Sequence, residues 1–190
     1  MGESSSDPIA IKIFLIGCGQ GDTILINVSR AAPRSEHWIL VDCCLKKREG
    51  VRKKFFEFVE EHEIRRLDLI VQTHADLDHF FGMDQVLRHF TSGDRSLGRY
   101  VDGGLDPKQA RAIMVDRQAH SRYVELQNTI NELADANLFE LRGFGPETES
   151  IGLASDTTTV EIVPLFPRRR RPGSRPGSRC CGWGRTRRPS

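Results

Sequence analysis

An apolar segment that ends abruptly in histidine and aspartate constrains the fold of this chain more than any other feature. Residues Leu67 to Val71 read Leu-Asp-Leu-Ile-Val, and Thr73 to His79 then read Thr-His-Ala-Asp-Leu-Asp-His. A short run rich in Leu, Ile and Val that is bounded by polar residues is typical of a buried strand. We therefore expect the ionisable side chains of the second segment to lie in a loop at the carboxyl end of that strand.

Four residues of this loop, His74, Asp76, Asp78 and His79, are the candidate metal ligands. Two carboxylates this close repel each other unless a cation compensates. Imidazole and carboxylate together suit Zn²⁺, and the carboxylates also admit Mn²⁺ or iron. The four positions cannot share one face of a helix or strand, but they can converge from a loop. The alternative interpretation is a helix start, with Asp78 as the N-cap and His79 in the first turn.

The rest of the chain alternates between strand and helix patterns. Ile9 to Ile16 and Thr23 to Val28 flank a Gly-rich turn, which predicts a hairpin. Further strands are predicted at residues 38–41, 67–71, 99–102, 139–142 and 158–165. Helices are predicted at 51–62, at 82–90, and from an Asp106-Pro107 start to about Asn137. This order predicts an α/β fold with a mixed sheet and helices packed on it.

Composition excludes several classes of protein. Five cysteines in 190 residues do not indicate a disulfide scaffold, and no apolar run approaches the roughly 18 residues of a membrane helix. The Ser- and acid-containing start of the chain shows no secretion signal. We therefore expect a cytoplasmic protein with no membrane partner.

The charge distribution divides the chain into three parts. Residues 1–8 are expected to be a flexible N-terminus, and residues 9–167 are expected to form one domain. Residues 168–190 hold nine Arg and no acidic side chain, and 19 of these 23 residues are Arg, Gly, Pro or Ser. Such a segment has too few apolar side chains to order itself, so a disordered tail is predicted. Its charge also offers an alternative function, non-specific binding of nucleic acid.

The residue pattern resembles that of a known family. His-x-Asp-x-Asp-His after an apolar strand resembles the second motif of the metallo-β-lactamase fold, usually written His-x-His-x-Asp-His. Asp at position 76 resembles the variant found in competence-protein (ComEC-like) metallo-hydrolase domains. The segment from Gly19 to Ile26 is similar to the first-hairpin signature of that subgroup, and Trp38 to Asp42 resembles its strand ending in the first-motif Asp. Gly82 matches the small residue after the second motif.

The resemblance implies a function and a set of roles. One divalent ion, most often Zn²⁺, would bind His74 and Asp76, and a second would bind Asp78 and His79. A water activated by the metal would hydrolyse a phosphodiester, in nucleic acid or a small molecule, with Asp78 as the proton acceptor. Asp42 would orient the loop by hydrogen bonds without binding metal, or else serve a turn. Asp22 could reach the same loop, or serve only its own hairpin turn.

The resemblance also implies ligands from later motifs: a further His, a bridging Asp and a last His. No His follows His120, and Val160 to Pro167 resembles the strand before the third motif. We therefore expect only the N-terminal part of an αββα sandwich, with a tail produced by a shift of reading frame. An inactive metal-binding fragment is the alternative function, and one face of the sheet should be exposed.

Overall fold

The computed structural model describes the central part of the chain, namely residues 8–17, 21, 23–31, 34–45, 50–103, 116–143, 151–154 and 159–162. The predictions of a flexible segment at 1–8, apart from Pro8, and of a disordered tail at 168–190 lie outside the described residues. Within the described part, no helix is long and apolar enough to cross a membrane.

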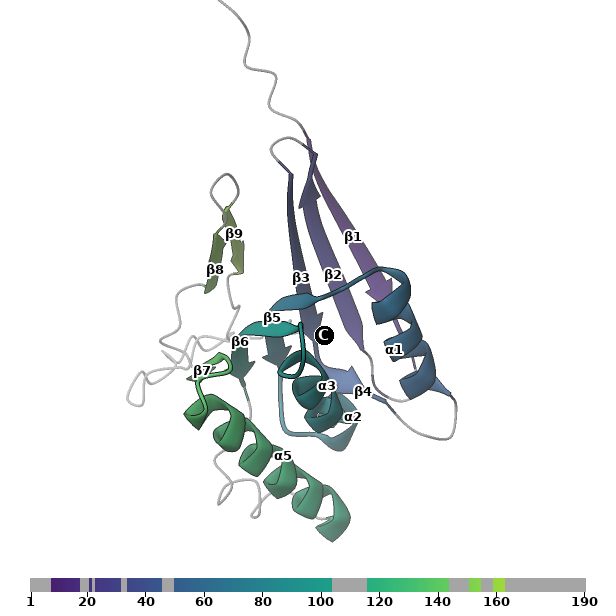
Figure 1. The fold of residues 1–190 in the computed structure, drawn as a ribbon. Helices are drawn as coiled ribbons and strands as arrows, with labels where there is room; N and C mark the ends of the chain where they lie inside the picture. Colours follow the sequence, from purple (N-terminus) through teal and green to yellow (C-terminus); the bar gives the residue numbers. More distant parts are fainter. Residues whose placement is uncertain are drawn as a thin grey trace, which may run out of the picture.

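The main element is a six-stranded mixed sheet with the strand order β1-β2-β3-β5-β6-β7 (Figure 1). Its strands are β1 (Ile9–Leu15), β2 (Ile24–Arg30), β3 (Ser35–Val41), β5 (Arg66–Gln72), β6 (Ser96–Asp102) and β7 (Glu140–Gly143). The first three strands are antiparallel, whereas β3, β5, β6 and β7 run parallel. The carboxyl ends of β3, β5 and β6 therefore meet at one edge, the usual position of a ligand site in such sheets. The predicted α/β fold with a mixed sheet is confirmed.

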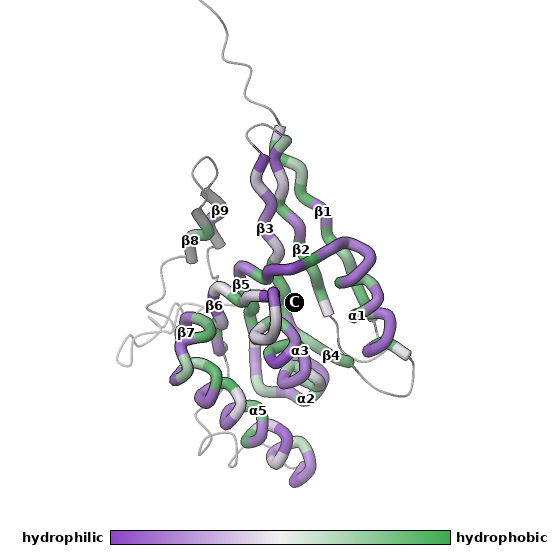
Figure 2. The backbone as a smooth tube through the Cα atoms, viewed as in Figure 1, coloured by the Kyte–Doolittle hydropathy of each residue, from purple (hydrophilic) through white to green (hydrophobic). Residues whose placement is uncertain are grey.

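The helices pack on one face of this sheet. They are α1 (Val51–Glu61), α2 (Leu77–Phe80), α3 (Met83–Phe90) and α5 (Arg117–Asp135). Hydrophobic and hydrophilic residues alternate along α5, as expected for a helix with one buried face (Figure 2). The core under the helices joins Leu40 and Tyr100 of the sheet to Phe55 of α1, Phe90 of α3 and Leu126 of α5. Burial of these apolar side chains is the main stabilising contribution to the fold.

The opposite face of the sheet carries a smaller apolar cluster. The short antiparallel strands β8 (Ile151–Ala154) and β9 (Thr159–Ile162) place Leu153 against Ile39, Leu69 and Val101. On the same face, at the edge strand β1, four large apolar side chains are 54–72% exposed: Ile9, Ile11, Ile13 and Leu15. Among the described residues, the expected exposure of one sheet face is therefore seen only along β1, because Ile39, Leu69 and Val101 on the same face are buried.

Two predictions for secondary structure are wrong. A single helix from Asp106 to about Asn137 is not formed, because Asp116 has an extended backbone and its carboxylate accepts a hydrogen bond from the Gln118 N–H. Asp116 is the N-cap of a new helix, α5. The predicted start at Asp106 lies outside the described residues. The loop after β5 is also not wholly irregular, since Leu77–Phe80 form the single turn α2.

Candidate metal centre

The site begins at Asp42, the residue directly after β3. Its backbone has a φ of 55°, a left-handed conformation that Asp tolerates better than most residues. The Asp42 N–H donates to the Val71 carbonyl at 2.8 Å, which joins the end of β3 to the neighbouring β5. The side chain is thereby placed at the edge where the parallel strands end.

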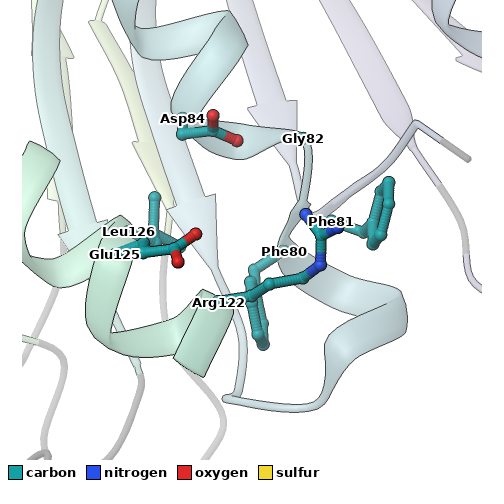
Figure 3. Close-up of a pocket in the computed structure, with 7 residues that line it drawn as sticks. All are labelled: Phe80, Phe81, Gly82, Asp84, Arg122, Glu125 and Leu126. Atoms are coloured by element: carbon teal, nitrogen blue, oxygen red, sulfur yellow. The ribbon is translucent and has the colours of Figure 1, made fainter. Parts of the chain in front are cut away.

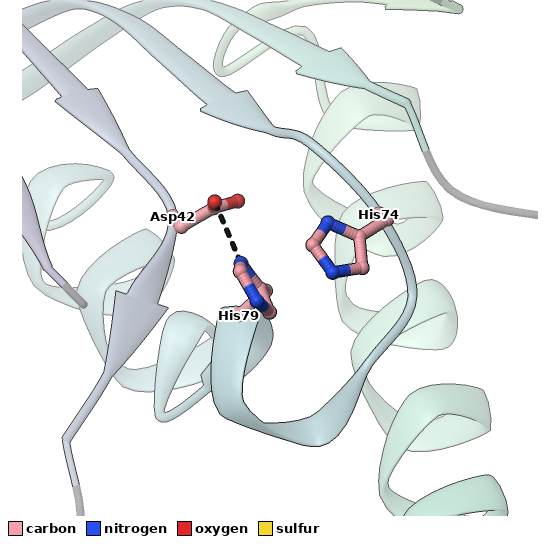
Figure 4. Close-up of side chains that lie close together, drawn as sticks. All are labelled: Asp42, His74 and His79. Atoms are coloured by element: carbon pink, nitrogen blue, oxygen red, sulfur yellow. Dashed lines mark hydrogen bonds and ion pairs between the residues drawn. The ribbon is translucent and has the colours of Figure 1, made fainter. Parts of the chain in front are cut away.

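The Asp42 carboxylate holds both ends of the histidine loop. One oxygen, Oδ1, accepts the Thr73 N–H at 2.7 Å. The other, Oδ2, accepts the Thr73 hydroxyl at 2.7 Å and lies 2.8 Å from His79 Nδ1 (Figure 4). The Asp42 side chain is only 9% exposed, so three hydrogen bonds satisfy a charge that would otherwise be costly to bury. Asp42 thus fixes the loop from the β3 side.

These hydrogen bonds assign the tautomers of both histidines. A carboxylate only accepts, so His79 Nδ1 must carry the proton that faces Asp42. The single hydrogen of the Thr73 hydroxyl goes to Asp42, and its oxygen therefore accepts from His74 Nδ1, 2.8 Å away. In its neutral form each imidazole is consequently the Nδ1–H tautomer, which presents the lone pair of Nε2. An Nε2 lone pair oriented by a hydrogen bond at Nδ1 is the usual arrangement of a metal-binding histidine.

Each Nε2 atom faces a carboxylate of the same loop. His74 Nε2 lies 3.4 Å from Asp76 Oδ2, and His79 Nε2 lies 3.8 Å from Asp78 Oδ2. Two tetrahedral ligands at about 2.1 Å from a metal are about 3.4 Å apart, so both separations suit an ion shared by a histidine and an aspartate. The two rings are themselves close, with centroids 3.7 Å apart. The donor set and its spacing therefore fit divalent metal.

A second grouping brings Asp42 together with the histidines. One ligand atom each from Asp42, His74 and His79 lies within 4.8 Å of the others, so these three could also hold an ion. Both Asp42 oxygens, however, already accept hydrogen bonds from Thr73 or His79. The predicted partner Asp22 lies outside the described residues.

The helix-start alternative for the motif is wrong. Asp78 lies inside α2, and α3 begins only at Met83, after Gly82. Asp76 occupies the N-cap position of α2 but makes no capping hydrogen bond with its side chain. The side chains of Asp76 and Asp78 are 73% and 44% exposed, so solvent or a ligand can reach both.

The loop packs closely against the first hairpin and β4 (Cys43–Cys44). Gly21 has a φ of 87°, and a Cβ there would lie 2.2 Å from the Asp78 carbonyl oxygen. Cys43 and Cys44 form parallel bridges to Phe80 and Phe81 at the end of α2. The glycine is therefore required both for its backbone conformation and for close approach to Asp78.

Sequence reasoning gave no role to Thr73 or Gln72, which both support the loop. Thr73 joins Asp42 to His74, as described above. Gln72 is completely buried, and its side-chain amide donates to the His74 carbonyl at 3.1 Å. The available signal was a glutamine that follows the apolar run Leu69 to Val71 and directly precedes the motif.

A small hollow lies beside α2, lined by Phe80, Phe81, Gly82, Asp84, Arg122, Glu125 and Leu126 (Figure 3). The Arg122 guanidinium lies 4.8 Å from the centre of the Phe81 ring, a cation–π contact. The cavity measures about 30 Å³, which holds water molecules and is far smaller than a typical substrate pocket. We assign it no ligand.

The fold and site together define a class: α/β proteins with a histidine- and aspartate-bearing loop at the carboxyl edge of a mixed sheet. Residues 37–173, more than two thirds of the chain, match the sequence model of the β-lactamase superfamily domain. The chain therefore belongs to the β-lactamase superfamily. A comparison with curated proteins gave no match.

Proposed function

We propose that this protein is a metal-dependent hydrolase that acts on phosphodiesters. One observation carries the metal-dependent part: the Nε2 lone pairs of His74 and His79 face the carboxylates of Asp76 and Asp78 at 3.4 and 3.8 Å. A neutral imidazole and a carboxylate that face each other with their acceptor atoms repel, and a divalent cation bound by both removes this repulsion. Membership of the β-lactamase superfamily supports the same conclusion.

Each of two ions would be bound by one histidine and one aspartate of the loop. His74 and Asp76 would hold one ion, and Asp78 and His79 the other, with Zn²⁺ favoured over Mn²⁺ or iron by the imidazole ligands. Bound divalent metal supplies Lewis acidity and lowers the pKa of water to about 7. Asp78, half-exposed at the open side of the loop, would accept the proton released during hydrolysis. Asp42 would keep both imidazoles oriented.

The substrate class rests on the resemblance to the ComEC-like subgroup. Asp76 stands where most metallo-β-lactamase motifs have histidine, and the first hairpin is similar to the hairpin of that subgroup. A phosphodiester, in nucleic acid or in a small molecule, is the substrate this resemblance implies. We also propose a cytoplasmic location, in line with the low cysteine content of the chain, five in 190 residues.

The test is hydrolysis of bis(p-nitrophenyl) phosphate and of a dinucleotide by the purified chain, first stripped of metal and then given Zn²⁺ or Mn²⁺. We expect activity only with metal, and its loss in both H74A and D78N. The matched control is H120A, since His120 lies in α5 and outside the metal loop. Activity that survives in H74A and D78N would contradict the proposal. Metal binding without turnover would favour the alternative of an inactive metal-binding fragment.

The second candidate, nucleic-acid binding through the basic tail, rests on the nine arginines of residues 168–190. Deletion of residues 168–190 tests it. If the tail binds, affinity for a DNA duplex should fall steeply with salt and disappear in the deletion variant. Unchanged binding after the deletion would exclude the tail as the binding element.

A further inference from the structure

Gln72 connects the metal loop to the next strand of the sheet. It is the last residue of β5, and its side chain is completely buried. Its carbonyl accepts the Gly103 N–H at 2.8 Å, just beyond the end of β6. Its side chain accepts the Tyr100 hydroxyl at 2.5 Å and donates to the His74 carbonyl at 3.1 Å. Gln72 thus forms two hydrogen bonds with β6 and the residue that follows it, and one with the histidine loop.

The direction of these bonds is fixed by elimination. The His74 carbonyl can only accept, so the NH₂ group of Gln72 must face it. The Gln72 oxygen then faces Tyr100, whose hydroxyl must donate. Burial raises the pKa of Tyr100 well above its usual value, and the Asp102 carboxylate raises it further. The hydroxyl therefore keeps its proton, and the chain Tyr100–Gln72–His74 has a single hydrogen-bond arrangement.

A buried amide is not needed for packing at this position. The preceding residues of β5, Leu69 to Val71, are all buried and apolar, and a leucine at position 72 would continue the same pattern. Burying an amide brings no gain in stability over an apolar side chain unless its hydrogen bonds are made. What the amide of Gln72 adds, compared with a leucine, is therefore a hydrogen bond that fixes the position of the main chain at His74.

His74 depends on this support more than His79 does. His79 bonds directly to Asp42, whereas His74 reaches Asp42 only through the Thr73 hydroxyl. The His74 side chain is also 47% exposed, so packing restricts it less than the 25% exposed His79. The position of its Nε2 atom thus follows mainly from where the main chain of the loop is held.

We propose that Gln72 and Tyr100 are positioning residues, which hold the His74 main chain so that Nε2 points at the metal shared with Asp76. This inference rests on the proposed metal binding of the loop. Asp42 fixes the loop from the β3 side, and the Tyr100–Gln72 pair fixes it from the β6 side. Partners of this kind, one contact removed from the metal, commonly change its affinity about 10- to 100-fold.

The test compares Zn²⁺ dissociation constants of the full-length wild type, Y100F, Q72L and H74A, measured by competition with a chelating dye. The Co²⁺ absorption spectrum of each variant reports the ligand geometry directly. T129V is the matched control, because Thr129 is a buried hydroxyl that accepts from Arg88 between α5 and α3, outside the loop. Thermal unfolding of the metal-free proteins measures stability separately. Y100F removes a single oxygen atom and therefore covers the case in which Q72L fails to fold.

We expect Y100F and Q72L to weaken Zn²⁺ binding at least about 10-fold and to alter the Co²⁺ spectrum. T129V should lose stability and keep the wild-type affinity and spectrum. If Y100F and Q72L bind as the wild type does while H74A binds weakly, the positioning role is wrong and the metal site stands. If the wild type binds no Zn²⁺, or H74A binds like the wild type, the metal site and the inference both fail.

Discussion

At the scale of single residues, the site depends on the Asp42 carboxylate, which accepts several hydrogen bonds at once. Asp42 accepts two hydrogen bonds from Thr73 and one from His79, and through Thr73 it also sets the tautomer of His74. Among the described residues, no other side chain is hydrogen-bonded both to His79 and, through Thr73, to His74. A change at Asp42 should therefore affect both proposed ions together.

D42N tests this directly. In D42N an NH₂ group replaces one carboxylate oxygen, either the one that accepts the Thr73 N–H or the one that accepts the Thr73 hydroxyl and His79 Nδ1–H. At least one buried donor then has no acceptor, which lowers the free energy of unfolding by about 1–3 kcal/mol. We expect Zn²⁺ affinity, measured by titration calorimetry, to fall at least about 10-fold. The matched control is D68N. Asp68 accepts the Trp38 N–H and the Arg66 Nε–H near the start of β5, so this variant should lose stability and keep its metal affinity. Equal affinity losses in both variants would contradict the role given to Asp42.

The close approach of Gly21 to Asp78 is a second effect of a single residue. G21A should be strongly destabilised, because it combines a left-handed backbone with a Cβ 2.2 Å from the Asp78 oxygen. G93A has a similar φ of 66° and open space around the added Cβ, so it should cost only about 1–2 kcal/mol. Urea unfolding of the two variants isolates the clash. If G21A and G93A have the same free energy of unfolding, the close approach of Gly21 to Asp78 does not contribute to stability.

At the scale of elements, the sequence predicted the strands better than the connections. The Ile-rich run Ile9 to Ile16 and the apolar run Leu67 to Val71 predict strands β1 and β5, because Ile, Val and other apolar residues favour strands. The helix expected from Asp106 failed since a cap at Asp116 outweighs continuous helical spacing. Strand β8, Ile151–Ala154, was missed because four residues with a glycine carry little pattern.

The clustering of the candidate ligands was predictable from the sequence, and the support from Asp42 was predictable only through the family resemblance, whereas the supports from Thr73, Gln72 and Tyr100 were not predicted. His74, Asp76, Asp78 and His79 follow one another in the sequence, so their clustering can be read from spacing. The bond from Asp42 to Thr73 spans 31 residues, and the bond from Tyr100 to Gln72 spans 28. Such contacts depend on strand order and register, which local patterns do not specify.

The packing of α3 against α1 should make stability depend on pH. Partial burial lowers the pKa of His89, and the Arg95 guanidinium lowers it further, while Glu60 opposes and Arg65 adds to the effect. The unfolded chain then binds the proton more tightly than the folded protein does. The contribution of His89 is therefore complete above its unfolded value near 6.5 and is lost as the pH falls below it.

Urea unfolding of the wild type and H89Q between pH 7.5 and 5 measures this contribution. We expect the wild type to lose more stability than H89Q over this interval, because glutamine does not titrate. An identical loss in the two proteins would show that His89 does not contribute to the acid sensitivity.

At the scale of the whole molecule, helices cover one face of the sheet, and the residues that the structure describes cover the other face only in part. Ile9, Ile11, Ile13 and Leu15 lie in a row on β1 and are more than half exposed. An exposed apolar face on an edge strand favours association between molecules. Self-association should therefore depend on this row of side chains.

The double variant I11T/I13T keeps β-branched side chains and removes apolar surface. We expect it to remain monomeric at concentrations where the wild type associates, as measured by light scattering, with little change in thermal stability. K12T, which changes the opposite face of the same strand, is the control. Association that is unaffected by I11T/I13T would contradict the importance of this face.

The central claim is that His74 and His79 are Nδ1–H tautomers whose Nε2 atoms bind divalent metal together with Asp76 and Asp78. Long-range proton–nitrogen NMR correlation of the imidazoles, recorded with and without Zn²⁺, tests it most directly. We expect protonated Nδ1 atoms throughout, and a change of the Nε2 signals of both residues on addition of Zn²⁺. Nε2 signals that do not respond to Zn²⁺, or metal bound through Nδ1, would contradict it.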